Sequence, residues 1–287
     1  MGSPYLIHGP ALISFSGGRT SAYMLKMILD AHGGALPDNV HVCFANTGKE
    51  REETLRFVHE CGSRWGVHVN WLERSDIDPR GFAEVGFNSA ARSGEPFAAL
   101  IAKKGYLPNS QARFCSVELK VRVMLDFCRA MDWTRWDSVV GLRADEGGRV
   151  ARANRANAAG KERWRAVMPL AVAGVTNRNV RDFWRNQDFD LELLPFEGNC
   201  DGCFLKARPK LYETERFKPG ILQWWADQER NAELMETATA SGAVFREGEP
   251  YAHIIDAARR QGDLFRGVFD GDPDMDAECG LWCEEAA

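Results

Sequence analysis

A glycine-rich loop near the start of the chain has the composition of an anion-binding site. It follows an apolar run at residues 11–15 that predicts a buried strand, and it leads into a helix predicted over residues 21–31. Glycines let the backbone approach an oxyanion closely, while hydroxyl groups and the N–H groups of a helix start favour negative charge. The loop consists of Ser16, Gly17, Gly18, Arg19, Thr20 and Ser21. No lysine follows its second glycine, so it is not the G-x-x-x-x-G-K-[ST] phosphate loop, and an ordinary glycine turn is the alternative.

Eight cysteines form the second group of residues that could do chemistry. Cys43, Cys61 and Cys128 lie in apolar or amphipathic segments and are predicted core residues, since a free thiol packs as a small apolar group. The others lie beside glycines, polar residues or the chain end: Cys115, Cys200, Cys203, Cys279 and Cys283. In a reducing compartment such residues serve as metal ligands or reactive thiols more often than as disulfides. The C-x-x-C turn at 200–203 brings two thiols together, and zinc, a redox dithiol and an iron–sulfur cluster all fit it.

The composition of the chain narrows the classes of function. The 287 residues carry a net charge of −5 with a pI near 5.8, which is no electrostatic signature of general nucleic-acid binding. No apolar stretch is long enough for a membrane span, and the N-terminus lacks the pattern of a secretory signal. We therefore expect a cytoplasmic protein without a membrane partner.

Alternating strand and helix patterns position these residues. Strands are predicted at residues 11–15, 40–45, 67–72 and 137–142, and helices between them at 21–31, 51–65 and 117–131. This alternation predicts an α/β fold with a doubly wound, mainly parallel sheet, in which ligands bind at the carboxyl ends of the strands. The polar stretch 143–165, rich in arginine and alanine, predicts a loop or lid.

Several motifs, in order along the chain, resemble the phosphoadenosine phosphosulfate (PAPS) reductase family of the adenine nucleotide α-hydrolase, or ATP-pyrophosphatase (PP-loop), superfamily. S-G-G-R-T-S is similar to the superfamily loop S-G-G-x-[DT]-S, and N-T-G-K-E at 46–50 is similar to N-T-G-x-E. R-F-C-S at 113–116, K-V at 120–121 and the later C-x-x-C resemble the C-C-x-x-[RK]-K-V…C-x-x-C pattern of cluster-bearing adenylyl-sulfate reductases, with Ser116 replacing one cysteine. G-L-R-A-D-E at 141–146 is similar to G-x-R-x-x-E, and E-C-G-L-W-C at 278–283 to a mobile E-C-G-L-H tail, with Trp282 replacing histidine.

The resemblance implies a site, cofactors and a division of the chain. Adenylyl sulfate, its 3′-phosphate form or ATP would bind to the glycine loop together with Asn46, Thr47, Glu50 and Arg143. A [4Fe–4S] cluster would be held by Cys115, Cys200 and Cys203, with the fourth position open or filled by Cys279 or Cys283. The alternative is a zinc site made of Cys200, Cys203, Cys279 and Cys283. Residues 1–190 would form the nucleotide-binding domain and 191–287 a cysteine-bearing, helical C-terminal region.

Three functions agree with this resemblance. In a sulfonucleotide reductase, Cys279 attacks the sulfur of the nucleotide, Cys283 acts as a resolving thiol, Arg143 binds an oxyanion, and a thioredoxin-like donor supplies electrons. In an ATP-dependent adenylating sulfurtransferase, the loop binds ATP and Mg²⁺, and sulfur passes from a donor to a nucleic acid or small molecule. Thr20 stands where pyrophosphatase-type members usually carry aspartate. The third function is a non-catalytic nucleotide-binding protein with structural zinc, and we expect an enzyme of one of the first two kinds.

Overall fold

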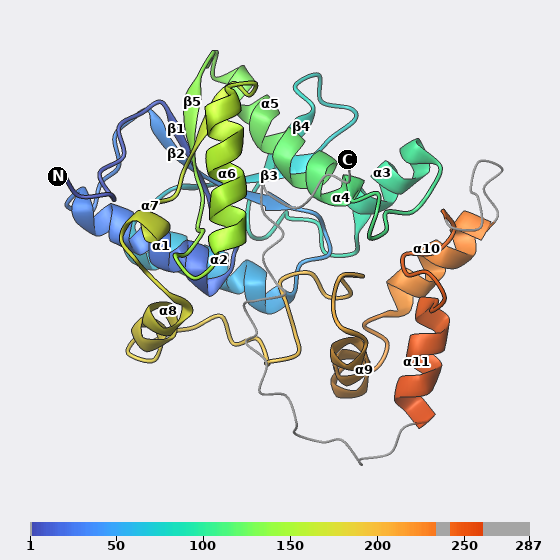
Figure 1. Ribbon diagram of the computed structural model, residues 1–287. Helices are drawn as coiled ribbons and strands as arrows, with labels where there is room; N and C mark the ends of the chain where they lie inside the picture. Colours follow the sequence, from blue (N-terminus) through green and yellow to red (C-terminus); the bar gives the residue numbers. More distant parts are fainter. Residues whose placement is uncertain (1, 234–241, 261–287) are drawn as a thin grey trace.

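The computed structural model describes residues 2–233 and 242–260 and has a six-stranded sheet at its centre (Figure 1). The strands are β1 (Ala11–Ser14), β2 (Val40–Asn46), β3 (Val69–Arg74), β4 (Phe82–Val85), β5 (Trp136–Val139) and β6 (Trp164–Val167). Their order is β4-β3-β2-β1-β5-β6, and every neighbouring pair is parallel except β3 and β4. The predicted α/β fold with a mainly parallel sheet is confirmed. The antiparallel edge strand β4 is an addition to the predicted strands.

Helices cover both faces of the sheet, and a further group lies beside it in the C-terminal part (Figure 1). The helices of the first part are α1 (Arg19–Ala31), α2 (Glu52–Trp65), α3 (Glu95–Lys104), α4 (Phe114–Ser116), α5 (Arg122–Ala130) and α6 (Gly147–Ala159). Those that follow are α7 (Pro169–Val172), α8 (Asn177–Trp184), α9 (Arg208–Phe217), α10 (Gln223–Glu233) and α11 (Tyr251–Arg260). A π-helical turn, η1 (Val117–Val121), joins α4 to α5.

Both faces of the sheet are covered, which is why its central strands β1 and β2 are mostly apolar. Ile13 and Phe44 point into a core shared with α1, α2 and α8, whereas Leu12 and Cys43 point into a core shared with α5. The three predicted core cysteines are confirmed, since all are buried. Burial raises the pKa of the Cys128 thiol to about 12, so it stays protonated and unreactive.

The C-terminal helices pack against α3 and the turn before α5. Phe97 of α3 and Phe114 of α4 share one apolar cluster with Trp225 of α10 and Tyr251 of α11. Trp225 is almost fully buried, and its ring contacts those of Phe97 and Tyr251. This cluster joins residues from both sides of position 190, and the domain boundary placed there stays a prediction.

The prediction of a loop or lid at 143–165 is wrong. Residues 147–159 form α6 and residues 164–167 form β6. Alanine and arginine both have high helix propensity, so this composition fits a helix as well as a loop. The side chain of Asn157 donates to the carbonyl of Ala166 at 2.9 Å and accepts from its N–H at 2.8 Å, which ties α6 to the last strand of the sheet.

Candidate functional site

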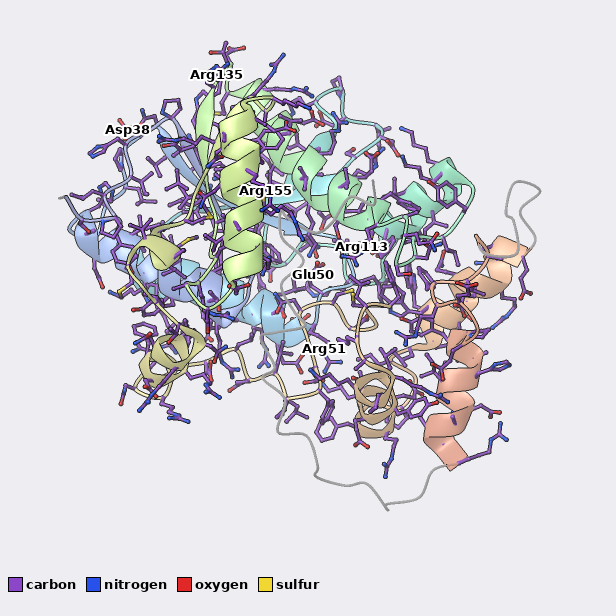
Figure 2. The ribbon with its side chains drawn as sticks, viewed as in Figure 1. Asp38, Glu50, Arg51, Arg113, Arg135 and Arg155 are labelled. Atoms are coloured by element: carbon purple, nitrogen blue, oxygen red, sulfur yellow. The ribbon has the colours of Figure 1, made fainter. Side chains whose placement is uncertain are left out.

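The glycine loop lies at the carboxyl edge of the sheet, between the end of β1 and the start of α1. Figure 2 shows Glu50 and Arg51, which follow β2, near the middle of the molecule. Asp38 and Arg135 precede β2 and β5 and mark the opposite edge. The predicted nucleotide-binding segments therefore share one edge of the sheet, where parallel α/β folds bind ligands.

The two glycines of the loop differ in what they require. Gly17 has a φ of +79°, and a Cβ there would lie 2.7 Å from Thr54 Cγ2 and 3.1 Å from Val58 Cγ2, so no side chain fits. Gly18 is the extended N-cap of α1, and a Cβ there would make ordinary contacts, the nearest at 3.6 Å with Asn199 Nδ2. The fold therefore requires glycine at position 17 but not at position 18. Close approach of a ligand to Gly18 stays a prediction.

The hydroxyl groups of the loop form a chain of hydrogen bonds. Ser21 Oγ donates to the Gly18 carbonyl at 3.0 Å, which uses its only proton. Ser16 Oγ therefore donates to Ser21 Oγ, 2.9 Å away. These bonds hold the first turn of α1 against the loop. Its N–H groups, which lack intrahelical partners, are thereby fixed in direction.

Arg143 reaches the loop from the end of β5 and is buried. Its Nη1 donates to Thr20 Oγ1 at 2.9 Å, and its Nε donates to Asp145 Oδ1 at 3.0 Å. Burial alone would raise the pKa of Asp145, but hydrogen bonds from the Asn177 backbone and from Arg143 lower it. A guanidinium paired with Asp145 consequently lies beside the start of α1, and a role for Arg143 in binding an oxyanion stays a prediction.

Arg19 is oriented differently from the other loop residues. Its guanidinium forms a two-pronged pair with Asp190, at 2.7 and 2.8 Å, and its carbonyl accepts from Trp184 Nε1 at 2.9 Å. These bonds dock α1 against α8 and the segment after it. A role for the Arg19 side chain in nucleotide binding stays a prediction.

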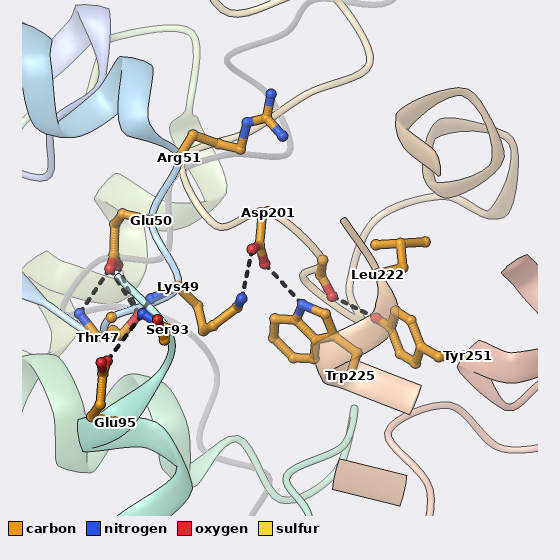
Figure 3. A network of polar contacts seen from close by, with 12 residues as sticks. Thr47, Lys49, Glu50, Arg51, Ser93, Glu95, Asp201, Leu222, Trp225 and Tyr251 are labelled. Carbon is orange, nitrogen blue, oxygen red and sulfur yellow. Dashed lines mark hydrogen bonds and ion pairs between the residues drawn. The ribbon is translucent and has the colours of Figure 1, made fainter. Parts of the chain in front are cut away.

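Residues 46–50, at the carboxyl end of β2, form a turn that is held together by hydrogen bonds of their own side chains. The carboxylate of Glu50 accepts from the Thr47 N–H at 2.8 Å and from Thr47 Oγ1 at 2.9 Å, and Lys120 Nζ lies 3.4 Å away (Figure 3). Asn46 Nδ2 donates to Glu73 Oε1 at 2.6 Å, and Asn46 Oδ1 accepts from the Gly48 N–H at 3.1 Å. Asn46, Thr47 and Glu50 thus shape a rigid turn, and direct ligand contact by any of them stays a prediction.

The cysteine turn is joined to this segment through backbone hydrogen bonds. The Arg51 N–H donates to the Asn199 carbonyl at 2.7 Å, and the Asp201 N–H donates to the Lys49 carbonyl at 2.9 Å. Glu50 and Cys200 consequently form an antiparallel bridge. The side chains add an ion pair of 2.8 Å between Lys49 Nζ and Asp201 Oδ2 (Figure 3). Far apart in sequence, the two motifs form one structural unit.

Two aromatic side chains of the C-terminal helices, Trp225 and Tyr251, donate hydrogen bonds to the cysteine turn at residues 200–203. Trp225 Nε1 donates to Asp201 Oδ1 at 2.8 Å, and Tyr251 Oη donates to the Gly202 carbonyl at 2.5 Å (Figure 3). A Cβ on Gly202 would overlap the indole nitrogen of Trp225. Position 202, the second of the two residues between the cysteines, is therefore glycine because the indole packs directly against its backbone.

The predicted ligand cysteines are only partly assembled in the described residues. Cys200 and Cys203 are partly buried on the turn, and Cys115 is partly buried in α4, packing against the same apolar cluster as Cys200. Burial, followed by the nearby Cys203, Asp201 and Glu50, raises the pKa of the Cys200 thiol, which metal binding would have to deprotonate. Within residues 2–233 and 242–260, no three Cys, His, Asp or Glu side chains converge to hold a metal ion. These residues do not by themselves form the predicted cluster or zinc site.

The remaining predicted ligand or catalytic residues, Cys279 and Cys283, lie outside the described residues.

Sequence reasoning missed Asn199, which links the turn to the glycine loop: its Nδ2 donates to the Ser16 carbonyl at 2.9 Å. Its place directly before the first cysteine of C-x-x-C was the signal available. Among the described helices, none is both long and apolar enough to cross a membrane.

Comparison with known proteins identifies the family. Residues 10–214 match the model of the phosphoadenosine phosphosulfate reductase domain, and the chain belongs to this family, as its motifs predict. The matched span contains the glycine loop, the segment after β2, Cys115, Arg143 and the cysteine turn.

Two individual proteins are similar to this chain. The uncharacterized nin region protein ORF290 of Escherichia phage lambda is 28% identical over 212 residues, which cover 70% of this chain and 67% of that protein. The solved structure of U34-tRNA thiolase NcsA from Methanococcus maripaludis with its [4Fe-4S] cluster has a TM-score of 0.40 and 12% identity. That comparison covers 81% of this chain and 79% of the thiolase chain.

Proposed function

We propose that this protein is an enzyme of sulfur chemistry, a sulfonucleotide reductase that binds an adenine nucleotide at the glycine loop. One observation carries the proposal. The cysteine turn is built onto the nucleotide-binding edge of the sheet, by the Glu50–Cys200 bridge and by the Asn199 hydrogen bond to Ser16. Family membership supports sulfur chemistry on a nucleotide in general terms. The substrate we propose is adenylyl sulfate or its 3′-phosphate form.

The charge at the loop favours a reductase over the ATP-dependent sulfurtransferase. The buried guanidinium of Arg143 donates to Thr20 Oγ1 at 2.9 Å, at the position where an aspartate would serve Mg²⁺. Asp145, 3.0 Å from Arg143 Nε, offsets part of this charge, but a cationic nitrogen 2.9 Å from Thr20 Oγ1 leaves that hydroxyl poorly placed to bind a divalent cation. The loop is therefore suited to an anion bound without a metal ion at residue 20.

The proposed reaction uses the thiol of Cys279, as in the reductases that the tail resembles. Its thiolate attacks the sulfur of adenylyl sulfate, the bond from sulfur to the bridging oxygen breaks, and AMP leaves with that electron pair. Cys279 then carries a thiosulfonate. The thiolate of Cys283 attacks the Sγ of Cys279, which releases sulfite and leaves a disulfide between the two cysteines. A thioredoxin-like dithiol reduces this disulfide and is itself oxidised.

The test is sulfite release from adenylyl sulfate and from its 3′-phosphate form, with a dithiol present. Cys279→Ser should abolish release, whereas Cys283→Ser should still form the thiosulfonate, visible by mass spectrometry as a gain of SO₃ on the tail. Cys61→Ser, a buried core substitution, is the control for effects on folding. Full activity of Cys279→Ser would refute the assignment of the nucleophile.

Two further measurements separate the alternatives. Pyrophosphate release from ATP that depends on Mg²⁺ and a sulfur acceptor, without sulfite release, would favour the sulfurtransferase. Iron, sulfide and zinc analysis of protein purified without oxygen tests both metal predictions. Stoichiometric zinc without turnover of any nucleotide would favour the non-catalytic protein.

A further inference from the structure

We propose that Asn199 contacts the ligand of the glycine loop, and that its amide oxygen accepts a hydrogen bond from a hydroxyl or amino group of the bound nucleotide. This inference rests on the proposed nucleotide binding. It adds to the site a residue that none of the sequence motifs described above includes.

The position of the Asn199 side chain is fixed. The residue is 3% exposed, and its Nδ2 donates to the Ser16 carbonyl at 2.9 Å. Because a carbonyl accepts but cannot donate, this bond decides which end of the amide is nitrogen. The same nitrogen lies 3.6 Å from the position of a Cβ on Gly18. The amide therefore lies directly against the loop that would hold the nucleotide.

The other end of the amide lacks a partner. Asn199 Oδ1 is buried and has no hydrogen-bond partner among the described residues. A buried polar atom without a partner is unfavourable, and such an atom next to a binding loop is a sign of a ligand group that completes it. Asn70, a buried amide in β3, instead donates to the Val42 carbonyl at 2.9 Å.

The chemistry of the unpartnered atom decides which part of a nucleotide it contacts. An amide oxygen only accepts, so it cannot bind the oxygens of a phosphate or sulfate, which also accept. The hydrogen-bond donors of an adenine nucleotide are the ribose hydroxyls and the amino group of the base. Arg143 and the start of α1 serve the anion, and Asn199 recognises the nucleoside.

Asn199 also connects the ligand to the cysteines. Its carbonyl accepts from the Arg51 N–H at 2.7 Å, and Cys200 follows it directly in the chain. A ligand bonded to the Asn199 side chain therefore holds the backbone from which the cysteine turn begins. By reciprocity, a nucleotide bonded to Asn199 stabilises the turn, and a stable turn strengthens nucleotide binding.

The experiment measures the affinity of the full chain for AMP and adenylyl sulfate by titration calorimetry. Asn199→Ala should weaken binding roughly 5- to 10-fold, the loss of one hydrogen bond. Asn70→Ala, the matched control, should change affinity less than about twofold. Wild-type affinity of a folded Asn199→Ala variant would overturn the inference. If the wild type binds neither nucleotide, it is the proposed function that fails.

A second test needs no variant. Wild-type protein is titrated with 2′-deoxy-AMP, 3′-deoxy-AMP and the AMP analogue that lacks the base amino group. One of the three should bind roughly 5- to 10-fold more weakly than AMP, because it lacks the donor that Asn199 Oδ1 accepts. Equal affinity of all four compounds would overturn the inference. AMP should also slow alkylation of Cys200 and Cys203 by iodoacetamide, and an unchanged rate at saturating AMP would overturn the connection to the cysteine turn.

Discussion

Glu229 of α10 makes the stability of the C-terminal helices depend on pH. It is 4% exposed, and its carboxylate accepts from the Phe245 N–H at 3.1 Å and from the Tyr251 N–H at 2.6 Å. Burial raises the pKa of Glu229 from 4.5 to about 7, with the nearby Glu233 adding to the rise and the two backbone hydrogen bonds opposing it. The folded protein consequently binds this proton more tightly than the unfolded chain does.

The sign and size of the effect follow from this difference. The favourable contribution is present in full below pH 4.5, and it is lost as the pH rises through about 7. A difference of this size between the folded and unfolded pKa corresponds to roughly 3 kcal/mol of unfolding free energy. Because Tyr251 Oη also binds the Gly202 carbonyl, the anchor of the cysteine turn weakens over the same pH range.

The assay is urea unfolding of the wild type and of Glu229→Gln at pH 5 and at pH 7.5. Glutamine cannot ionise, but it offers only one acceptor atom to the two backbone N–H groups, so the variant should be less stable at pH 5. At pH 7.5 the wild type has lost the stabilisation that comes from protonated Glu229. Its advantage in unfolding free energy over the variant should therefore be roughly 2 to 3 kcal/mol smaller than at pH 5. Glu233→Gln, which leaves both bonds in place, is the control. A gap that is the same at both pH values would refute the reasoning.

Two further predictions concern the loop and the sheet edge. Gly17→Ala should cost about 2 to 4 kcal/mol of unfolding free energy, because alanine is strained at a φ of +79° and its Cβ would lie 2.7 Å from Thr54 Cγ2. Gly18→Ala should cost less than about 1 kcal/mol of unfolding free energy but should weaken AMP binding. Thermal unfolding with and without AMP distinguishes the loss of stability in Gly17→Ala from the loss of binding in Gly18→Ala. Asn157→Ala removes both hydrogen bonds to Ala166 and should cost about 1 to 3 kcal/mol in urea unfolding, with an unchanged midpoint as the contrary result.

Most of the sheet could be predicted from the sequence because strand and helix patterns alternate over the first half of the chain. The elements that were missed depend on tertiary contacts. β4 is a four-residue edge strand that pairs only with β3. β6 is a four-residue strand that pairs with β5 and is joined to α6 by the Asn157 side chain, and no local sequence pattern predicts these contacts.

The sequence motifs predict which segments form the candidate site, but they do not predict which side chains of those segments contact each other. Family resemblance found the loop, the segment after β2, Arg143 and the cysteine turn. It could not show that Glu50 and Thr47 bind each other, or that Asp201 pairs with Lys49. The first contact joins residues three apart in the chain, whereas the second depends on the chain returning to the end of β2 after β6, and sequence spacing does not encode such a return.

The hydrogen bonds that join residues 49–51 to residues 199–201 have a consequence for dissecting this protein. Lys49 and Arg51 are buried cations whose carboxylate partners, Asp201 and Glu197, come from the later segment. A fragment that stopped at residue 190 would lose both of these carboxylates and the backbone hydrogen bonds with residues 199 and 201, while Arg51 would keep its ion pair with Glu53. Shortened versions of this chain for expression or crystallisation should therefore be more stable when they retain the cysteine turn.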